Sequence, residues 1–244
     1  MDRRRCSLND VASDGTPVGR RVVLGMITLG AAGVAFGAPV ERAVERVVTP
    51  IREKDPTGLS DLVPVGGFRY YTVTSSVPRL GPNDYRLRLH GLVDRPLTLT
   101  LADLGRMRQT TLVRDFQCVT GWRVAAVHWS GVLLRDLLAA AGVQPTATAL
   151  TFRSFDGLYD ESLTLAQATR PDVLVALTML GAPVTHDHGG PVRLYVAPMY
   201  GYKSIKWLDE IEVVDAVAPG YWERQGYDVD GWVGRSNGRA DEAV

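Results

Sequence analysis

Residues 193–208 read RLYVAPMYGYKSIKWL. Arg193 begins an apolar run whose β-branched and aromatic residues predict a strand, and residues 207–214 predict another. The loop between them holds Lys203 and Lys206. Lysines in a loop are usually solvated, but with Arg193 they form a compact basic patch in a chain without net charge. We interpret this patch as a binding site for an anionic group such as a phosphate.

Residues 186–191, just before this stretch, read HDHGGP. Two histidines at positions i and i+2 could ligate a metal such as zinc directly, or the loop could simply be solvated. In a third interpretation, the glycines let backbone N–H groups approach an anion, and Arg193 adds a planar fork for phosphate. Because a buried guanidinium needs an anionic partner, we favour phosphate binding over a zinc site.

Cys118 lies in the segment DFQCVTGW, residues 115–122. On residue type alone, a buried core cysteine is the more common outcome, by roughly two to one. The alternatives are a nucleophile, with His128 or His188 as its base, and a metal ligand. A thiolate is a soft ligand, so a single cysteine suffices where a cofactor supplies the other ligands of the metal.

Composition narrows the possible classes of protein. The 244 residues include 27 Lys and Arg and 27 Asp and Glu, so no nucleic-acid partner is expected. With only Cys6 and Cys118, the chain has neither a disulfide framework nor a four-cysteine metal site. Residues 234–238 read GRSNG and match the Gly-x-Ser-x-Gly pattern of hydrolases. That pattern requires a histidine later in the chain, and none follows Ser236, so this class of hydrolase is excluded.

Residues 1–40 predict an export segment. Arg20 and Arg21 directly precede residues 22–40, which carry no charge. A twin arginine before a mildly apolar, glycine-rich run is typical of the pathway that exports folded proteins, which allows cofactor insertion in the cytoplasm. The run is marginally long enough to span a bilayer, so a cleaved signal and an uncleaved membrane anchor both stay open. We expect residues 41–61 to be a linker and the protein to be periplasmic or otherwise extracytoplasmic.

The folded domain is predicted over residues 62–227, followed by a C-terminal tail, residues 228–244. We expect the aromatic residues of the stretch from residue 218 onwards to pack on the domain and the last few residues to fray. Thr100 is a suitable cap for the first predicted helix, and Gly142 ends the second. Short strands and short helices without regular alternation predict an α+β fold. Strands are expected at residues 68–74, 85–91, 96–100, 150–155, 174–179, 192–197 and 207–214, and helices at residues 101–107, 133–141 and 162–168.

Beside these interpretations, residues 193–213 resemble the molybdopterin-binding signature of the sulfite oxidase superfamily. Gln117-Cys118 resembles that family's metal-binding cysteine segment, and residues 129–134 resemble the Trp-x-Gly-x-x-Leu stretch that follows it. Residues 154–159 are similar to a pterin-facing segment, and residues 219–227 to the closing segment. The resemblance implies the family's α+β molybdopterin-binding domain, with mixed sheets and short helices.

The resemblance also implies a molybdenum–molybdopterin cofactor and two-electron oxygen-atom transfer, with water as the source or sink of oxygen. Cys118 would be the protein ligand to the metal, and Cys118 and Tyr200 the catalytic residues. The cofactor-binding positions would be Cys118, His188, Arg193, Lys203, Ser204 and Lys206, with Ser154, Tyr70 and Tyr71 as weaker matches.

Two departures from the sulfite-oxidising members make sulfite the less favoured substrate. Those members carry an Arg-Asn-His segment early in the domain, where residues 71–74 here read YTVT. They also carry an arginine four residues after the cysteine, where this chain has Trp122, with Arg123 one residue later. Sulfite is a dianion, and its binding needs fixed positive charge near the metal.

The chain is more similar to the bacterial single-domain reductases of the superfamily, because too few residues remain for a C-terminal dimerisation domain. That similarity implies a catalytic subunit that receives electrons from a membrane haem protein. Its substrate would be a small molecule or a group of the methionine-sulfoxide type. A sulfite-oxidising enzyme and a non-catalytic cofactor-binding module are the alternatives.

Overall fold

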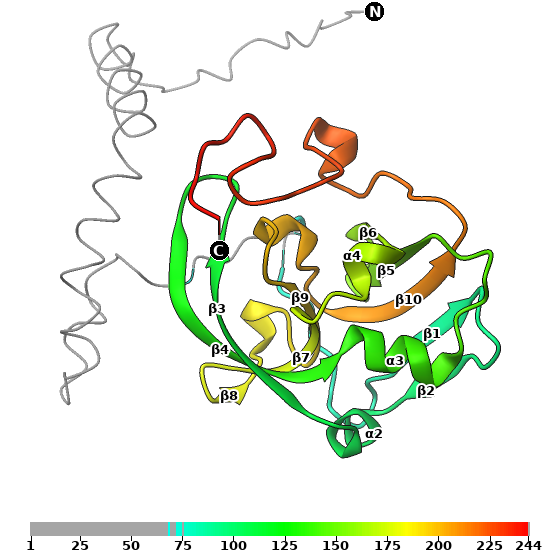
Figure 1. Cartoon of the computed structure of the whole chain (residues 1–244). Helices are drawn as coiled ribbons and strands as arrows, with labels where there is room; N and C mark the ends of the chain where they lie inside the picture. Colours follow the sequence, from blue (N-terminus) through cyan, green and yellow to red (C-terminus); the bar gives the residue numbers. More distant parts are fainter. Residues whose placement is uncertain (1–67, 69–71, 75, 244) are drawn as a thin grey trace, which may run out of the picture.

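The computed structural model describes residues 68, 72–74 and 76–243. The predicted export segment, the linker, Tyr70 and Tyr71 lie outside the described residues. The first of two sheets has the strand order β2-β1-β10-β5-β6 (Figure 1). Its strands are β1 (Leu87–Gly91), β2 (Leu97–Leu99), β5 (Ala149–Ser154), β6 (Asp160–Thr164) and β10 (Leu208–Val214). The pairing of β1 with β10 is parallel and the other pairings are antiparallel, so early and late parts of the domain share one sheet.

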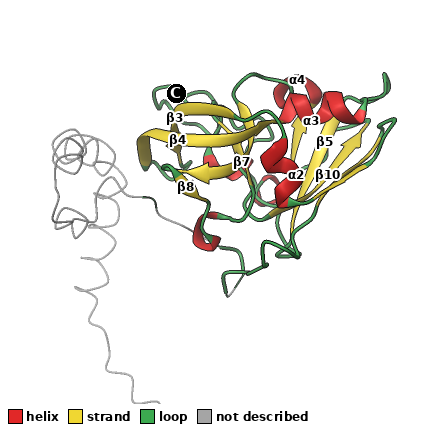
Figure 2. Cartoon of the chain, turned by 90° about the horizontal axis from the view of Figure 1, so that it is seen from below, coloured by secondary structure: helices red, strands yellow, loops and turns green. Residues whose placement is uncertain are grey.

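The second sheet lies beside the first and is antiparallel throughout (Figure 2). It runs in the order β3-β4-β7-β8, and β9 also pairs with β7. Its strands are β3 (Thr110–Gln117), β4 (Arg123–Leu133), β7 (Val173–Met179), β8 (Ala182–Pro183) and β9 (Arg193–Val196). Two sheets joined by short helices confirm the predicted α+β class, with β-structure predominating.

Two helices form where local sequence signals predict them. Helix α2 (Leu101–Arg106) begins with a capping box between Thr100 and Asp103. Helix α3 (Leu134–Ala141) buries one face and ends at Gly142, whose φ of 73° is in the left-handed region. Within the described ranges, no helix has both the length and the apolar character needed to cross a bilayer.

Two predicted elements are wrong in part. Residues 162–168 were predicted as a helix, but β6 pairs with β5 as far as Thr164, and only α4 (Leu165–Ala168) is helical. Cross-strand pairing therefore overrides the local helical pattern until Thr164 caps the helix. The strand predicted at residues 68–74 is not formed at the positions described, Phe68 and residues 72–74.

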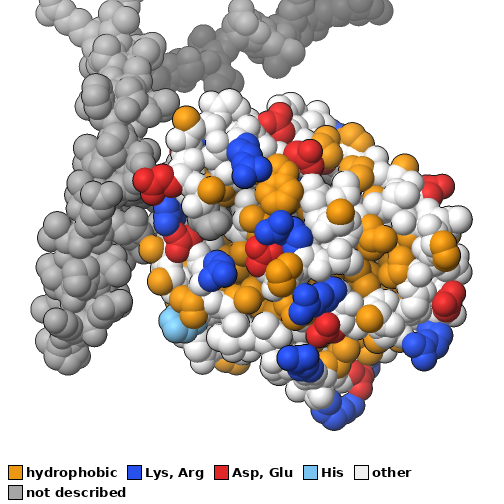
Figure 3. Space-filling view, viewed as in Figure 1, with side chains coloured by type: hydrophobic (Ala, Val, Ile, Leu, Met, Phe, Trp, Pro, Cys, Tyr) orange, Lys and Arg blue, Asp and Glu red, His pale blue; other side chains and the backbone are white. Residues whose placement is uncertain are grey.

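Charged side chains of both signs are interspersed on the face seen in Figure 3. On the first sheet, Arg153 pairs with Glu210 and lies 2.9 Å from Glu212, and Arg88 also pairs with Glu210. Exposed pairs of this kind contribute about 0–1 kcal/mol each to stability. The charge of these side chains on the first sheet is therefore balanced locally.

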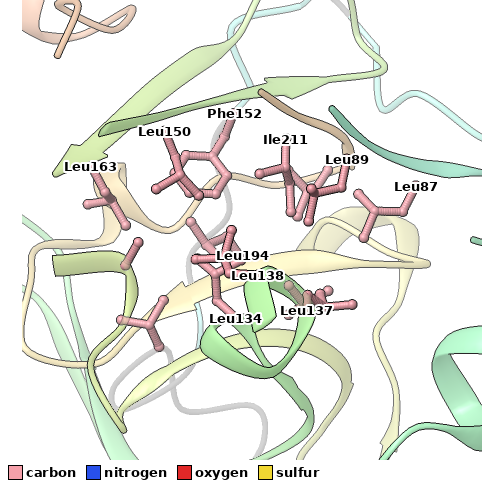
Figure 4. Packing of buried hydrophobic residues seen from close by; sticks show 14 of the residues in the cluster. Leu87, Leu89, Leu134, Leu137, Leu138, Leu150, Phe152, Leu163, Leu194 and Ile211 are labelled. Atoms are coloured by element: carbon pink, nitrogen blue, oxygen red, sulfur yellow. The ribbon is translucent and has the colours of Figure 1, made fainter. Parts of the chain in front are cut away.

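The main hydrophobic core lies between the first sheet and a layer made by α3 and β9 (Figure 4). Leu134, Leu137 and Leu138 of α3 point towards Leu150 and Phe152 of β5. Leu194 of β9 joins the same cluster, which ties the second sheet to the first. Burying a leucine side chain completely contributes about 1.5–3 kcal/mol.

The C-terminal segment packs over the ends of both sheets, from β10 across to β3 and β4 (Figure 1). It contains the short 3-10 helix η4 (Glu223–Gln225). Trp232 forms an isolated bridge with Met199, and Gly231 accepts a hydrogen bond from the Tyr200 backbone at 2.7 Å. Val233 is buried, so the packing on the domain continues beyond residue 227.

Candidate active site

A cavity of about 420 Å³ lies where loops from both sheets meet the C-terminal segment. This volume is in the range that accommodates a small molecule or cofactor. Its wall is formed by the loop after β3, the β5–β6 turn, the 3-10 helix η2 (His186–His188), residues 201–207 and residues 221–227. Nine of the described lining residues are aromatic: Phe68, Phe116, Trp122, Tyr159, Tyr202, Trp207, Tyr221, Trp222 and Tyr227.

Cys118 lies at the cavity wall, directly after β3. Its N–H donates to the Trp122 carbonyl at 2.8 Å, and its own carbonyl accepts from Gly121 at 3.0 Å, which closes a tight turn. The thiol is partly exposed, with Sγ 3.2 Å from Thr120 Oγ1. It is therefore not a fully buried core cysteine. His188 lines the same cavity, whereas His128 is exposed on β4 and is not a lining residue.

A metal site made by protein side chains alone does not occur in the described part of the chain. No cluster of three or more His, Cys, Asp or Glu side chains with suitable geometry is found there. The interpretation of His186 and His188 as direct zinc ligands therefore finds no support. A metal at Cys118 would need its remaining ligands from a cofactor or solvent.

Arg193 is buried in the wall of the cavity. Its Nη1 donates to the carbonyl of His188 at 2.8 Å and its Nη2 to the carbonyl of Ser204 at 2.9 Å, so it joins the two loops. The guanidinium lies 5.3 Å from the ring centres of both Phe116 and Trp129. No carboxylate of the described residues forms an ion pair with it, and burial lowers its pKa to about 10. Its charge is thus available to an anion in the cavity.

Lys206 and His188 are the other basic side chains at the cavity. Burial, and then the charge of Arg193, lowers the pKa of Lys206 to about 7. The pKa of His188 is lowered by burial and then by Arg193 and Lys206. Crowded cations of this kind are stabilised by a bound anion, which would restore their ordinary protonation.

The glycines of residues 186–191 have a packing role that the sequence interpretation missed. The N–H groups of Gly189 and Gly190 donate to His186 and Thr185, so they are not directed at an anion. A Cβ at Gly190 would lie 1.9 Å from the Val184 carbonyl oxygen. At Gly189, where φ is 99°, a Cβ would lie 2.5 Å from Lys206 Cβ. The glycines therefore allow this loop to pack tightly beside Lys206.

Of the predicted site residues, five line the cavity together: Cys118, His188, Arg193, Ser204 and Lys206. Ser204 contributes through its position in the loop, and its Oγ accepts from the Val196 N–H at 3.0 Å.

Three others do not line the cavity. The Tyr200 hydroxyl donates to Asp241 at 2.8 Å, and Ser154 Oγ accepts from the Asp156 N–H at 3.2 Å. Lys203 is fully buried and forms ion pairs with Glu161 and Glu223. These side chains have partners within the protein, and their contact with cofactor or substrate stays a prediction.

Asp156 is a cavity residue that the sequence interpretation missed. Its Oδ1 accepts from the N–H groups of Leu158 and Tyr159, both at 2.9 Å. Its Oδ2 is buried with no hydrogen-bond partner among the described residues. A buried carboxylate oxygen without a partner is suited to an N–H donor of a ligand. The sequence signal for Asp156 is the resemblance of residues 154–159 to a pterin-facing segment.

The second missed feature is the C-terminal aromatic wall, which we define as Tyr221, Trp222 and Tyr227. Tyr221 stacks on Tyr159 at 5.6 Å, and Trp222 contacts both Tyr221 and Tyr227 edge to face. Tyr227 also contacts Tyr202 at 5.5 Å. This part of the cavity is therefore largely apolar with phenol groups.

Neither Trp122 nor Arg123 adds a cation to the cavity. Trp122 stacks on Phe116 at 5.7 Å. Arg123 pairs with Asp115, lies 3.8 Å from Glu242, and is not among the lining residues. Among the described lining residues, the basic side chains are Arg193, Lys206 and His188.

Residues 74–222 match the family described as the oxidoreductase molybdopterin binding domain. The chain belongs to this family. It is a molybdopterin-binding oxidoreductase of the sulfite oxidase type, and membership implies a molybdenum cofactor.

Several relatives of this family are similar to the chain. An uncharacterized oxidoreductase of Bacillus subtilis (strain 168), YuiH, is 33% identical over 65% of this chain and 84% of the relative. The sulfite oxidases of Arabidopsis thaliana and Rattus norvegicus are both 32% identical, but the chain spans only 45% and 33% of their lengths. The crystal structure of the sulfane dehydrogenase SoxCD from Paracoccus pantotrophus superposes with a TM-score of 0.53. It is 27% identical, covering 58% of this chain and 41% of that one.

The residues present fit a molybdopterin cofactor. Cys118 offers one soft ligand, Arg193 and Lys206 offer positive charge for a phosphate and other anionic groups, and His188 offers an N–H donor. The unpartnered Oδ2 of Asp156 offers an acceptor for the N–H groups of a pterin. Each of these groups lines the same cavity.

Proposed function

We propose that this chain is an exported catalytic subunit that reduces a neutral sulfoxide, such as oxidised methionine, by two-electron oxygen-atom transfer. The observation that carries the proposal is the distribution of charge in the cavity. The basic lining residues, Arg193, Lys206 and His188, are those assigned to the cofactor, and Arg123 pairs with Asp115 instead.

A sulfite dianion would need fixed positive charge beyond that used by the cofactor. The remaining wall is aromatic, and it suits an uncharged substrate with apolar groups. A sulfoxide combines such groups with one polar oxygen. Similarity to sulfite oxidases keeps sulfite oxidation as the second candidate.

In the proposed reaction the cofactor, when bound, supplies the two-electron chemistry at its metal. Cys118 holds the metal, while Arg193 and Lys206 hold the anionic part of the cofactor. Asp156 accepts hydrogen bonds from the pterin and fixes its orientation. The C-terminal aromatic wall packs on the organic groups of the substrate and excludes water.

The role of Cys118 is tested by the variant Cys118→Ser in the full-length exported protein. We expect wild type to contain close to one molybdenum per chain, and the variant to lose at least about 100-fold in turnover, because the thiolate ligand is lost. Molybdenum is measured by elemental analysis and turnover with a dye electron donor. Wild-type protein with far less than one equivalent of molybdenum, or unchanged turnover in Cys118→Ser, would contradict the proposal.

The substrate class is tested with the same wild-type protein. We expect turnover of methionine sulfoxide and dialkyl sulfoxides with a reduced dye, and at least about tenfold lower kcat/KM for sulfite with an oxidised dye. The variant Trp122→Arg would add the missing cation and should favour sulfite. Faster sulfite oxidation than sulfoxide reduction in wild type would instead support the second candidate.

We also propose the twin-arginine pathway for export and a membrane haem protein as electron donor. Support for export comes from Arg20, Arg21 and the uncharged residues 22–40. The haem partner rests on the similarity to bacterial single-domain reductases. Co-purification from solubilised membranes of the native source, followed by a haem absorption spectrum, tests the partner.

A further inference from the structure

Lys203 lies at the centre of a buried ionic cluster that is separate from the cavity lining. Its Nζ donates to Glu161 Oε1 at 2.6 Å, to Glu223 Oε1, and to the Val229 carbonyl oxygen at 2.9 Å. The three charged side chains are fully buried. An ammonium has three N–H donors, so every donor of Lys203 has an acceptor.

This cluster connects residues 201–207, which form part of the cavity wall, to the C-terminal segment. Lys203 ends the 3-10 helix η3 (Gly201–Lys203), Glu161 lies on β6, and Glu223 begins η4. The Tyr221 N–H reinforces the connection by donating to the Asp160 carbonyl of β6 at 3.0 Å. Within the segment, the Gly220 N–H donates to Glu223 Oε2 at 2.5 Å. The attached segment is the one that provides the C-terminal aromatic wall.

We propose that Lys203, with Glu161 and Glu223, positions the C-terminal aromatic wall against the cavity, and that protonation of the cluster controls how firmly the wall is held. Lys203 is thus a positioning residue that acts through residues 220–229. The inference concerns the shape of the cavity and does not depend on which substrate is used.

The cluster holds two carboxyl groups and one ammonium, so its full ionisation would leave a buried negative charge unbalanced. Glu161 is the group that takes up a proton. Its Oε2 is buried with no partner among the described residues, whereas Glu223 Oε2 accepts from Gly220. Burial raises the pKa of Glu161 to about 8, and Glu223 adds to the effect while Lys203 opposes it.

The other groups near the cluster do not substitute for Glu161. Burial holds the pKa of Tyr159 and that of Tyr202 above the ordinary value, so both phenols stay neutral. Arg224 and Asp160 form an exposed pair at 2.7 Å. Asp228 is exposed beyond Tyr202.

The direction of the pH dependence follows from the raised pKa. Protonated Glu161 favours the state in which the C-terminal aromatic wall packs against the cavity. This packing is therefore most stable below pH 4.5, the ordinary pKa of glutamate, and weakens as the pH rises through about 8, the pKa of Glu161 in the folded protein. Between pH 6 and 8, we expect the equilibrium constant for opening of residues 220–229 to increase at least about threefold. Titration of a single group can change this constant by at most about tenfold per pH unit.

Hydrogen exchange of the full-length protein, followed by mass spectrometry at pH 6 and 8, measures this opening. Rates are divided by the intrinsic exchange rate at each pH. We expect peptides covering residues 219–229 to lose protection at pH 8, while peptides from β4 and β7 do not. Glu161→Gln keeps the shape of the protonated group and cannot ionise, so its protection should be equal at the two pH values.

Arg224→Gln is the matched control, because it removes an exposed ion pair of the same segment outside the cluster. It should retain the pH dependence of wild type. Lys203→Met should open the segment at both pH values. If that variant does not fold, the comparison of Glu161→Gln with Arg224→Gln decides the matter.

A second readout separates positioning from general stability. With any substrate turned over by the holoenzyme, KM should rise from pH 6 to 8 in wild type and Arg224→Gln, and stay constant in Glu161→Gln. Protection of residues 219–229 that does not change with pH in wild type, or a pH dependence that persists in Glu161→Gln, would overturn the proposal.

Discussion

In the cofactor-free chain, both burial and the charge of Arg193 disfavour the charged form of Lys206. Burial and Arg193 lower its pKa to about 7 from the ordinary value of 10.5. The unfolded chain therefore binds more protons than the folded chain between these two pH values, and the stability that depends on Lys206 rises with pH across that window. Below pH 7 the full cost of the buried ammonium is present.

Replacing this lysine with methionine should therefore stabilise the cofactor-free protein. At pH 7, Lys206→Met should unfold with a free energy higher by about 1–2 kcal/mol, after allowance for solvent screening, and the difference should shrink towards pH 10. Denaturant unfolding at pH 7 and 9.5 measures it, with Lys206→Arg as a control that stays charged at both. The variant should also retain less cofactor. A destabilised Lys206→Met protein, or a difference that is constant with pH, would count against this account.

Predicted site residues lie together at the cavity where one continuous segment forms its wall. Arg193, Ser204 and Lys206 fall in one continuous motif, and all three line the cavity. Within the same motif, the 3-10 turn of η3 directs Lys203 towards Glu161, 42 residues away in the sequence. A sequence motif does not show in which direction a side chain of a turn points, nor which distant carboxylate it will pair with.

At the scale of elements, glycine packing explains the geometry of the loop before β9. A Cβ at Gly190 would meet three backbone atoms, two of Val184 and one of Thr185, within 2.9 Å. Backbone cannot move aside as a flexible side chain can. The loop must therefore shift if this glycine is replaced.

The variant Gly190→Ala should lower the free energy of unfolding by about 1–3 kcal/mol and reduce cofactor content, because His188 and Arg193 flank the loop. Gly105→Ala is the matched control. No atom lies within 4 Å of a Cβ there, and the position is inside α2, so the substitution should stabilise by up to about 1 kcal/mol. Denaturant midpoints of the two variants give the comparison. Equal midpoints for both would refute the packing argument.

Elements whose signals are local were predictable, and elements defined by partners were not. Helices α2 and α3 have a capping box and a left-handed glycine respectively, within a few residues of their ends. Strand β4 went unpredicted because its long antiparallel pairing with β3 and β7 decides its conformation. Strand β6 likewise depends on its register with β5.

At the scale of the whole molecule, the proposed export pathway makes a prediction about location. Replacing both Arg20 and Arg21 with lysine should prevent export, because that pathway reads the arginine pair. Fractionation of cells producing the full-length chain would show at least about a tenfold fall of protein outside the cytoplasm. Replacing Arg3 and Arg4 with lysine, which preserves the pair, is the control and should leave export unchanged. Normal export of the Arg20 and Arg21 variant would exclude this pathway.

The order of synthesis gives the closing segment a further consequence. Residues 221–227, which line the cavity, are synthesised later than the segment that contains Arg20 and Arg21. During synthesis, the proposed export segment would therefore be exposed before the cavity is complete. If the proposed pathway transports only folded protein, export would begin only after the C-terminal aromatic wall has been synthesised and packed. Truncations at the carboxyl end should then leave apoprotein stalled on the cytoplasmic side.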